Sequence, residues 1–371
     1  MTDLLPPRSY SFDYQSSSAV TWSDGVRTFV RDYSFDARNV IRAGAGLPSA
    51  PLLDLLEVAF AAYFSDRLAR RRDERDRGRG VQWRRHLTVR VGVRDVSVWN
   101  QPHVQTALAA FLNFLTEDKW DFEFLPRRAP LWDVEQQSYL IAPTTSAAAG
   151  VMLYSGGLDS FAGLATYMSD SHSEWVLVSG APNPRHKGLQ AAQVAAARHL
   201  TRRNVFHITV PYSLATTVDA PLEERSQRAR SFLFLTLGVI AAERVGADAL
   251  LMCENGVGAI NLPIDGTQVG TSNARAAHPA TLLRFNRLLE SLIGDSVRAR
   301  NPFWDITKGE ACRHENLREL GHAIAETVSC DSFPLRCSMS RIRRSMSSIV
   351  ISRPYISFKL LGHRGPYEIR S

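Results

Sequence analysis

The feature that most constrains the fold is the turn SGGLDS at residues 155–160, which lies between a short apolar run and an amphipathic run. Residues 151–154 (VMLY) predict a buried strand, and residues 160–169 carry apolar side chains at helical spacing. Two adjacent glycines allow backbone angles that other residues avoid, and they let a ligand approach the main chain. The N–H groups and the dipole at a helix start favour a phosphate. The stretch therefore predicts a phosphate-binding turn, although the lysine of a Walker loop is missing.

The region after residue 150 alternates between strand and helix patterns. We expect strands at 151–154, 175–178, 205–210 and 249–252, and helices at 160–169, 188–200 and 223–245. Such alternation predicts an α/β fold, a doubly wound parallel sheet with helices on both faces. Sheets of this kind bind ligands at the carboxyl ends of their strands. The SGGLDS turn, as residues 155–160 are called below, is expected at that edge.

Before residue 149 the pattern is mixed and no chemical motif stands out. Strands are expected at 10–14, 87–93 and 121–124, and helices at 50–70 and 104–115. A run of small residues at 142–150 indicates a boundary. The sequence thus predicts an N-terminal α+β region of residues 1–148 with no assigned role, a second unit of residues 149–337, and a basic tail of residues 338–371.

The net charge of +7 is concentrated in two segments. Nine arginines lie between Arg67 and Arg85, and the tail is also basic, which leaves the rest of the chain mildly acidic. We interpret the arginine run as a helix end and a solvated loop, with contact to nucleic acid or an acidic partner as the alternative. The acidic remainder argues against nucleic acid. No signal peptide and no apolar stretch of membrane-spanning length is present, so we expect a soluble cytoplasmic protein without membrane contact.

Asp159 is the unusual member of the SGGLDS turn. Ser155 and Ser160 add hydroxyl donors, but a carboxylate beside an anion requires a metal ion or a donor group of the substrate. The alternative is a tight turn with Ser160 as the N-cap of the next helix. A cap would need neither the glycine pair nor Ser155, so phosphate binding is the favoured interpretation.

The SGGLDS turn resembles the pyrophosphate loop of the N-type ATP pyrophosphatases, the PP-loop superfamily, whose fold is of the adenine nucleotide alpha-hydrolase (HUP) type. Residues 230–234, 241–247, 301–310 and 327–330 resemble segments of one member, 7-cyano-7-deazaguanine synthase (QueC). Residues 254–257, 261–263 and 278–279 are more similar to the longer QueC-like (QatC-like) proteins of anti-phage defence systems, which also carry an extra N-terminal region. The resemblance covers roughly residues 151–337.

The resemblance implies an ATP-dependent enzyme with Mg²⁺ that adenylates a carboxylate of a 7-carboxy-7-deazaguanine-like substrate, releases pyrophosphate, and forms an amide or nitrile. A protein amine of a defence-operon partner is a further acceptor. Asp159, Lys308 and Arg230 would be catalytic, although both cations also fit plain surface positions on helices. Glu254 and Asn255 would bind the guanine-like base, or form an ordinary loop. The nucleotide cradle would consist of Ser155, Gly156, Gly157, Leu158, Asp159 and Ser160. The alternatives are a tRNA-modifying relative and a non-catalytic nucleotide-binding module of a defence complex.

The zinc site that the resemblance implies is incomplete. Cys330 and Cys337 stand alone where QueC has four cysteines, and structural zinc takes four ligands. Cys312, His314 and His322 could contribute, or the cysteines bind no Zn²⁺. The tail that follows is rich in Ser and Arg and has no alanine, so we hypothesise a frameshift near Cys337 and expect residues 338–371 to be peripheral or poorly ordered.

Overall fold

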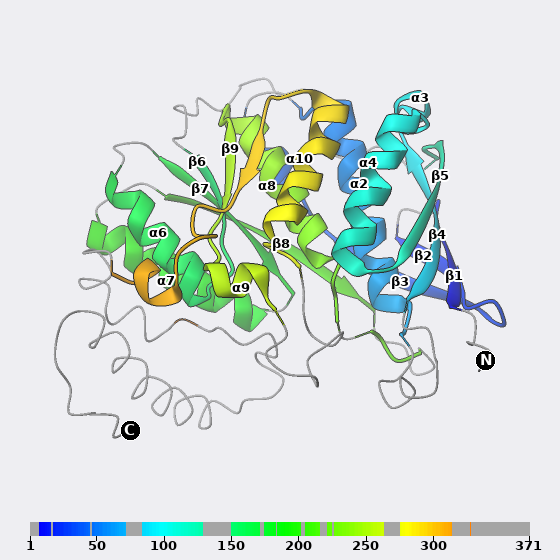
Figure 1. The fold of residues 1–371 in the computed structure, drawn as a ribbon, viewed down its shortest axis with the longest axis horizontal. Coiled ribbons are helices and arrows are strands. Elements are labelled where there is room, and N and C mark those ends of the chain that lie inside the picture. The colour runs from blue at the N-terminus through cyan, green and yellow to red at the C-terminus, as the bar shows by residue number, and fades with distance from the viewer. Residues whose placement is uncertain are drawn as a thin grey trace.

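The computed structural model describes residues 7–15, 18–44, 47–71, 84–128, 150–170, 174–182, 184–201, 205–215, 221–224, 226–262, 275–313 and 327 (Figure 1). Residues 7–128 are called the N-terminal half below, and residues 150–313 the second half. The strands are β1 (Arg8–Tyr14), β2 (Ala19–Ser23), β3 (Thr28–Phe35), β4 (Arg85–Val93), β5 (Lys119–Pro126), β6 (Gly150–Leu153), β7 (Trp175–Ala181), β8 (Val205–Leu214), β9 (Ala249–Met252) and β10 (Arg298–Arg300). The helices are α1 (Arg38–Ile41), α2 (Ala50–Leu68), α3 (Val96–Trp99), α4 (Pro102–Thr116), α6 (Leu158–Asp170), α7 (Pro184–Thr201), α8 (Arg230–Val245), α9 (Gly256–Ile260), α10 (Pro279–Ile293) and α11 (Lys308–Ala311).

All of these strands belong to a single sheet in the order β10-β9-β6-β7-β8-β3-β2-β1-β4-β5. The five strands of the second half are parallel to their neighbours. Taken in chain order, their arrangement is the 3-2-1-4-5 order of a doubly wound sheet. In that order the crossover direction reverses between β6 and β9, and the ligand crevice of such a sheet opens there.

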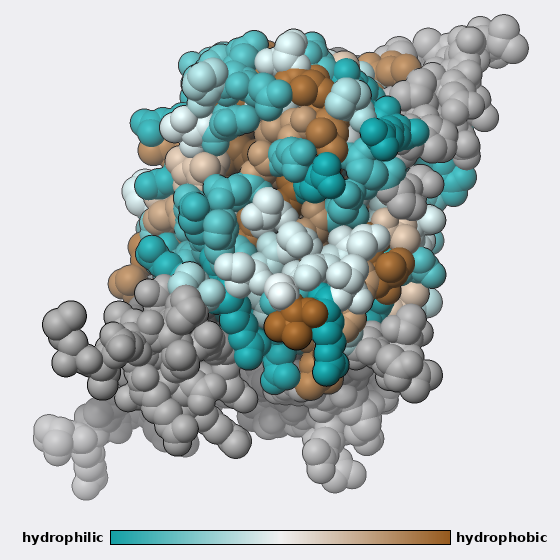
Figure 2. Space-filling view, turned by 90° about the vertical axis from the view of Figure 1, so that its right-hand side faces the viewer, coloured by the Kyte–Doolittle hydropathy of each residue, from teal (hydrophilic) through white to brown (hydrophobic). Residues whose placement is uncertain are grey.

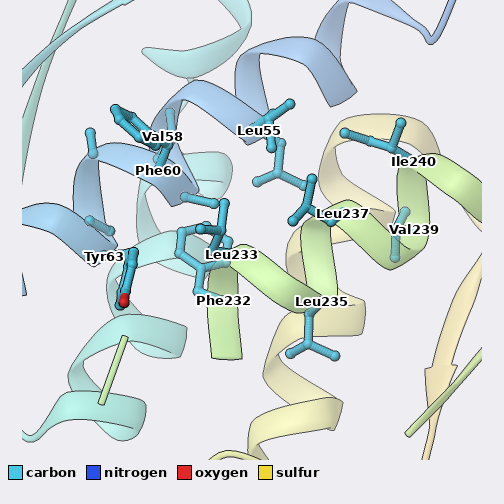
Figure 3. Close-up of a cluster of buried hydrophobic side chains, with 14 of the residues drawn as sticks. Leu55, Val58, Phe60, Tyr63, Phe232, Leu233, Leu235, Leu237, Val239 and Ile240 are labelled. Atoms are coloured by element: carbon cyan, nitrogen blue, oxygen red, sulfur yellow. The ribbon is translucent and has the colours of Figure 1, made fainter. Parts of the chain in front are cut away.

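The two halves of the chain are joined by backbone pairing and by packing. β3 pairs antiparallel with β8, with Tyr33 opposite Leu214 and Phe35 opposite Tyr212. α2 also packs along α8, and their apolar side chains share one core (Figure 3). A region expected to precede the parallel sheet therefore extends that sheet.

Alternate residues of the strands enter two different cores, as the pleat of a strand requires. Val151, Val176 and Val178 belong to the core that contains α2, α4, α8 and α10. Met152 and Leu177 belong to the second core, beneath α6 and α7. The second half thus has helices on both faces of its sheet, as the sequence predicted.

The opposite face of the N-terminal strands is polar. Arg90 of β4 lies between Asp13 of β1 and Glu123 of β5, at 3.2 and 2.9 Å from their carboxylate oxygens. These side chains are half exposed, and the side of the molecule that carries these strands is mainly hydrophilic or neutral (Figure 2). Half-exposed cross-strand ion pairs of this kind each contribute at most about 1 kcal/mol to stability.

Most elements agree with the sequence prediction, and four points need correction. The helix expected from residue 223 begins at Arg230, because the preceding residues are held in turns by contacts with the N-terminal half. The β2–β3 hairpin was missed, although Asp24-Gly25 is a strong turn signal and Gly25 has a φ of 87°. α10 was missed as well, although Pro279 at its first position is a helix-start signal.

The fourth correction concerns the arginine run. Arg71 and Arg85 are not solvated: they are 5% and 1% exposed and pair with buried carboxylates. Residues 72–83 of the run and the whole tail, with its expected disorder, lie outside the described residues. None of the helices in the described residues combines the length and the apolar composition that a membrane span requires.

Candidate functional site

The SGGLDS turn connects the end of β6 to the start of α6, as predicted. Gly156 has a φ of 82°, a backbone conformation that favours glycine. The Ser155 hydroxyl accepts a hydrogen bond from the Gly157 N–H at 3.2 Å, and it lies 3.2 Å from the Ser160 hydroxyl. Ser160 in turn donates to the Gly157 carbonyl at 2.9 Å. The two serines therefore brace the glycine pair, while Ser155 itself stays exposed at the sheet edge.

Two glutamines of α7 hold the turn from behind. Gln190 donates to the Ser155 carbonyl and Gln193 to the Gly156 carbonyl, each at 3.2 Å. Tyr154 donates to the Gln193 side-chain oxygen at 2.7 Å. A Cβ added at Gly156 would lie 3.2 Å from that oxygen and 3.3 Å from Gln190. The close approach of α7 is thus a second reason for glycine at this position.

Asp159 lies at the centre of a small polar cluster. It is 8% exposed, in the first turn of α6. One carboxylate oxygen accepts from the Asn255 amide at 2.9 Å, and the other lies 2.7 Å from the Lys308 ammonium. The sequence argument expected a metal ion or a substrate donor beside Asp159, and the structure places the Lys308 ammonium there. Three segments far apart in the chain meet here.

Local structure fixes both partners of Asp159. Asn255 is the N-cap of α9, and its side-chain oxygen accepts from the Gly258 N–H, so its amide nitrogen is the group that faces Asp159. Lys308 begins α11, behind a capping box in which Thr307 and Glu310 satisfy each other's backbone N–H groups. Helix starts therefore place Asp159, Asn255 and Lys308 alike.

Asn301 ties the loop after β9 to the loop after β10. Its side-chain oxygen accepts from the backbone N–H groups of Glu254 and Phe303, at 3.2 and 3.0 Å. Its amide donates to the Glu254 carbonyl at 2.8 Å. The Glu254 carboxylate is half buried and lies 3.4 Å from the Asn255 amide. Of the two predicted base-binding residues, Asn255 is thus engaged with Asp159, and Glu254 is held at the rim of the same cluster.

Arg230 is placed at the first residue of α8 and is half buried. α8 packs on β6 and ends three residues before β9, a strand parallel to β6, so Arg230 lies at the end of α8 nearest the carboxyl edge of the sheet, where the SGGLDS turn also lies. Burial lowers the pKa of His186, a bond with the Ser155 backbone raises it, and the charge of Arg230 lowers it. Arg230 and Lys308 therefore approach the SGGLDS turn from two different elements.

A buried polar chain lies beneath the turn. Ser179 of β7 donates to the Tyr154 carbonyl at 2.5 Å, and its hydroxyl lies 2.9 Å from His207 Nε2. Burial, with added repulsion from Arg198 and Lys187, lowers the pKa of His207 to about 4. The imidazole is therefore neutral at pH 7. Its Nε2–H can donate to the Ser179 hydroxyl, and that hydroxyl donates to the carbonyl of Tyr154, the residue before the turn.

This chain predicts a pH-dependent stability. Between about pH 6.5 and 4, His207 is protonated in the unfolded chain but stays neutral in the folded protein. The free energy of unfolding therefore falls as the pH falls through that window, by up to about 3 kcal/mol. In urea unfolding at pH 7.5 and 4.5, His207→Gln should show a smaller loss than the parent protein. His199→Gln, at an exposed position of α7, should leave the loss unchanged. Equal losses in all three proteins would contradict the assignment.

The described residues contain no group of three or more His, Cys, Asp or Glu that could hold a metal ion. Cys253 is buried, and burial with the nearby charges of Asp159 and Glu254 raises its thiol pKa, which disfavours the thiolate that zinc needs. Cys312 is half buried and forms no disulfide within the described part of the chain. Cys330, Cys337, His314 and His322 lie outside the described residues.

The donor set does fit a nucleotide-bound Mg²⁺. Magnesium in such sites uses one or two protein carboxylates and takes its other ligands from phosphates and water. Asp159 offers one carboxylate, already paired with an exchangeable cation, and Glu254 offers a second near the same amide.

The structure brings most of the predicted site residues together. The SGGLDS residues, Asn255 and Lys308 form one cluster, with Glu254 at its rim and Arg230 near His186. The sequence argument missed Gln190, Gln193, Ser179 and Asn301. Only Asn301 had a signal, since Asn-Pro after a strand marks a turn.

A comparison of the sequence with protein-family models and with curated proteins finds no match. The function is therefore argued from the site.

Proposed function

We propose that this protein is an ATP-dependent, AMP- and pyrophosphate-forming enzyme of the QueC-like type, built on a HUP-type sheet. Its substrate would be a carboxylate on a 7-deazaguanine, which it converts to an amide or a nitrile. The observation that carries the proposal is the meeting of Asp159, Lys308 and Asn255 at the SGGLDS turn, beside the switch point of the sheet.

The charges at the turn suit a leaving pyrophosphate. The start of α6 contributes the positive end of a helix dipole, and Lys308 and Arg230 supply two formal charges from separate elements. Lys308 is 40% exposed, so it can leave Asp159 for a phosphate oxygen without disturbing a core. Donors fixed in advance stabilise charge as it develops, which is the main protein contribution to phosphoryl and nucleotidyl transfer.

Each residue then has a defined task. The serines and the glycine backbone bind the β- and γ-phosphates, and the α7 glutamines keep the turn in shape. Lys308 and Arg230 stabilise charge on the departing pyrophosphate. Mg²⁺, held by Asp159, would neutralise phosphate charge and orient the nucleotide. The substrate carboxylate attacks the α-phosphorus, and Glu254 at the cluster rim is placed to accept hydrogen bonds from a guanine-like base.

The tRNA-modifying alternative has less support. Binding a polynucleotide needs a basic surface, and Arg67, Arg71 and Arg85 of the arginine run are engaged in internal ion pairs. We therefore propose a small-molecule substrate, with a cytoplasmic location and protein partners of a defence system. A non-catalytic nucleotide-binding module remains the competing class.

Product analysis tests the proposal. The protein is incubated with Mg²⁺-ATP, ammonium and 7-carboxy-7-deazaguanine, and nucleotides are separated by chromatography. We expect AMP and pyrophosphate in equal amounts, and only with the carboxylate present; 7-deazaguanine without the carboxyl group is the matched control substrate. ADP as the product would overturn the proposal, and ATP binding without turnover would favour the binding module.

A further inference from the structure

We propose that the N-terminal half positions Arg230 at the SGGLDS turn and thereby contributes to anion binding, although the N-terminal half does not itself contact the anion. In this role the N-terminal half is called the frame below. The inference rests on the proposed function, in which Arg230 faces the phosphates. It gives a role to a region in which the sequence shows no chemical motif.

Three consecutive residues before Arg230 are each bonded to a side chain of the N-terminal half. The side-chain oxygen of Gln227 accepts from the Tyr63 hydroxyl at 3.1 Å. Arg228 donates to Glu117 at 2.8 Å. The N–H of Ala229 donates to the Asp66 carboxylate at 2.9 Å.

The chain just upstream of Gln227 is held in the same way. Glu223 accepts from Arg31 at 3.0 Å and from Arg67 at 3.1 Å. Glu224 accepts from the Arg71 N–H at 2.8 Å, and its own N–H donates to the Arg67 carbonyl at 2.7 Å. The described part of the connection between β8 and α8 is therefore held by α2 and its flanking residues, with further contacts from β3 and from the end of α4.

Gln227 itself has a φ of 42°, which is uncommon for a residue with a side chain. Its carbonyl accepts from the Arg230 N–H at 3.2 Å, so the backbone angle at Gln227 sets where α8 begins. Such a conformation persists only where the surroundings over-determine it, and here they do so through Tyr63. Figure 3 shows Tyr63 with its hydroxyl, on α2 beside the start of α8.

The frame is itself anchored by buried charges. Arg85 bridges Asp66 and Asp118, at 2.5 and 2.6 Å, and Arg71 pairs with Asp118 at 2.6 Å. These side chains are at most 4% exposed. Asp66 thus contacts Arg85 with one carboxylate oxygen and accepts from the Ala229 N–H with the other, so the buried cluster holds the residue that bonds the start of α8.

The last connection joins the start of α8 to the SGGLDS turn. Arg230 begins α8 at the carboxyl edge of the parallel sheet, the edge that also carries the SGGLDS turn, and it lies near His186, which bonds the Ser155 backbone. A shift at the start of α8 would therefore move a positive charge relative to the phosphate cradle. Because charge stabilisation depends on distance, loss of the frame should weaken anion binding even if the fold remains intact.

The test uses inorganic pyrophosphate with Mg²⁺ as the probe and isothermal titration as the measurement. Tyr63→Phe removes the hydroxyl that holds Gln227 and keeps the ring in the core. Gln227→Gly removes the same bond from the other side while tolerating the positive φ. Tyr14→Phe is the matched control, because it removes a buried tyrosine hydroxyl whose hydrogen-bond partner is Ser65 of α2 and not a residue before α8. We expect about fivefold weaker binding for Tyr63→Phe and Gln227→Gly, and unchanged binding for Tyr14→Phe.

A double-mutant cycle makes the assignment specific. In an Arg230→Gln background, Tyr63→Phe should cause no further loss, because the charge that it positions is gone. Full additivity of the two losses would overturn the inference, as would wild-type affinity in Tyr63→Phe and Gln227→Gly. Absence of pyrophosphate binding by the parent protein would overturn the proposed function itself, so the two failures are distinguishable.

Discussion

Asp159→Asn should lower pyrophosphate release by about 10²-fold or more while the protein stays folded. The change removes the negative charge that pairs with Lys308 and holds Mg²⁺, but an amide oxygen can still accept from Asn255. Asparagine is the better test than alanine, because Asp159 is buried and its truncation would strand the Asn255 amide. The melting temperature should change little, since Lys308 is 40% exposed and such pairs contribute at most about 1 kcal/mol.

The same substitution at exposed Asp305, three residues before Lys308, is the matched control and should leave release unchanged. Lys308→Met should reproduce the loss seen in Asp159→Asn, because the two residues act on the same phosphates. Near-normal release by Asp159→Asn, with a protein that melts normally, would remove Asp159 from the mechanism.

Arg85→Met should destabilise the fold by about 3–5 kcal/mol in urea unfolding. Arg85 is 1% exposed and lies between two fully buried carboxylates, so its loss leaves Asp66 and Asp118 with Arg71 as the one remaining cation among the described residues that pair with them. Burial alone would raise the pKa of Asp118, and the arginines hold it below the ordinary value, which is how the cluster keeps its charges.

Arg90→Met is the control from the same strand. Arg90 also pairs with two carboxylates, but it lies on the polar face and is 46% exposed, so its loss should cost no more than about 1 kcal/mol. Equal destabilisation by the two substitutions would contradict the view that the buried cluster stabilises the N-terminal half more than the exposed ion pairs do.

The elements that sequence analysis predicted well are those whose signal is local. The SGGLDS turn and Lys308 at a helix start follow from glycine geometry and capping residues within a few positions. The buried role of Arg85 could not be predicted, because a run of arginines resembles a solvated loop until Asp118, 33 residues away, is placed beside it.

The glutamines of α7 were hidden for a related reason. On a helix with many polar residues, Gln190 and Gln193 look like part of a solvent-facing surface, yet both are buried against the turn. The pairing of β3 with β8, which joins the two halves, could not be predicted from the sequence either. The two strands lie about 180 residues apart, and nothing in the pattern of either one identifies its partner. Partners distant in sequence are set by tertiary packing, which no local pattern encodes.

Transfer of an oxygen isotope tests the central claim most directly. The substrate 7-carboxy-7-deazaguanine is labelled with ¹⁸O in its carboxylate and incubated with the protein, Mg²⁺-ATP and ammonium, and the AMP is analysed by mass spectrometry. Attack of a carboxylate oxygen on the α-phosphorus forms an acyl-adenylate, and expulsion of AMP by ammonia leaves that oxygen on the phosphate. The account predicts AMP heavier by one ¹⁸O and unlabelled pyrophosphate. Unlabelled AMP, or label in orthophosphate, would contradict it.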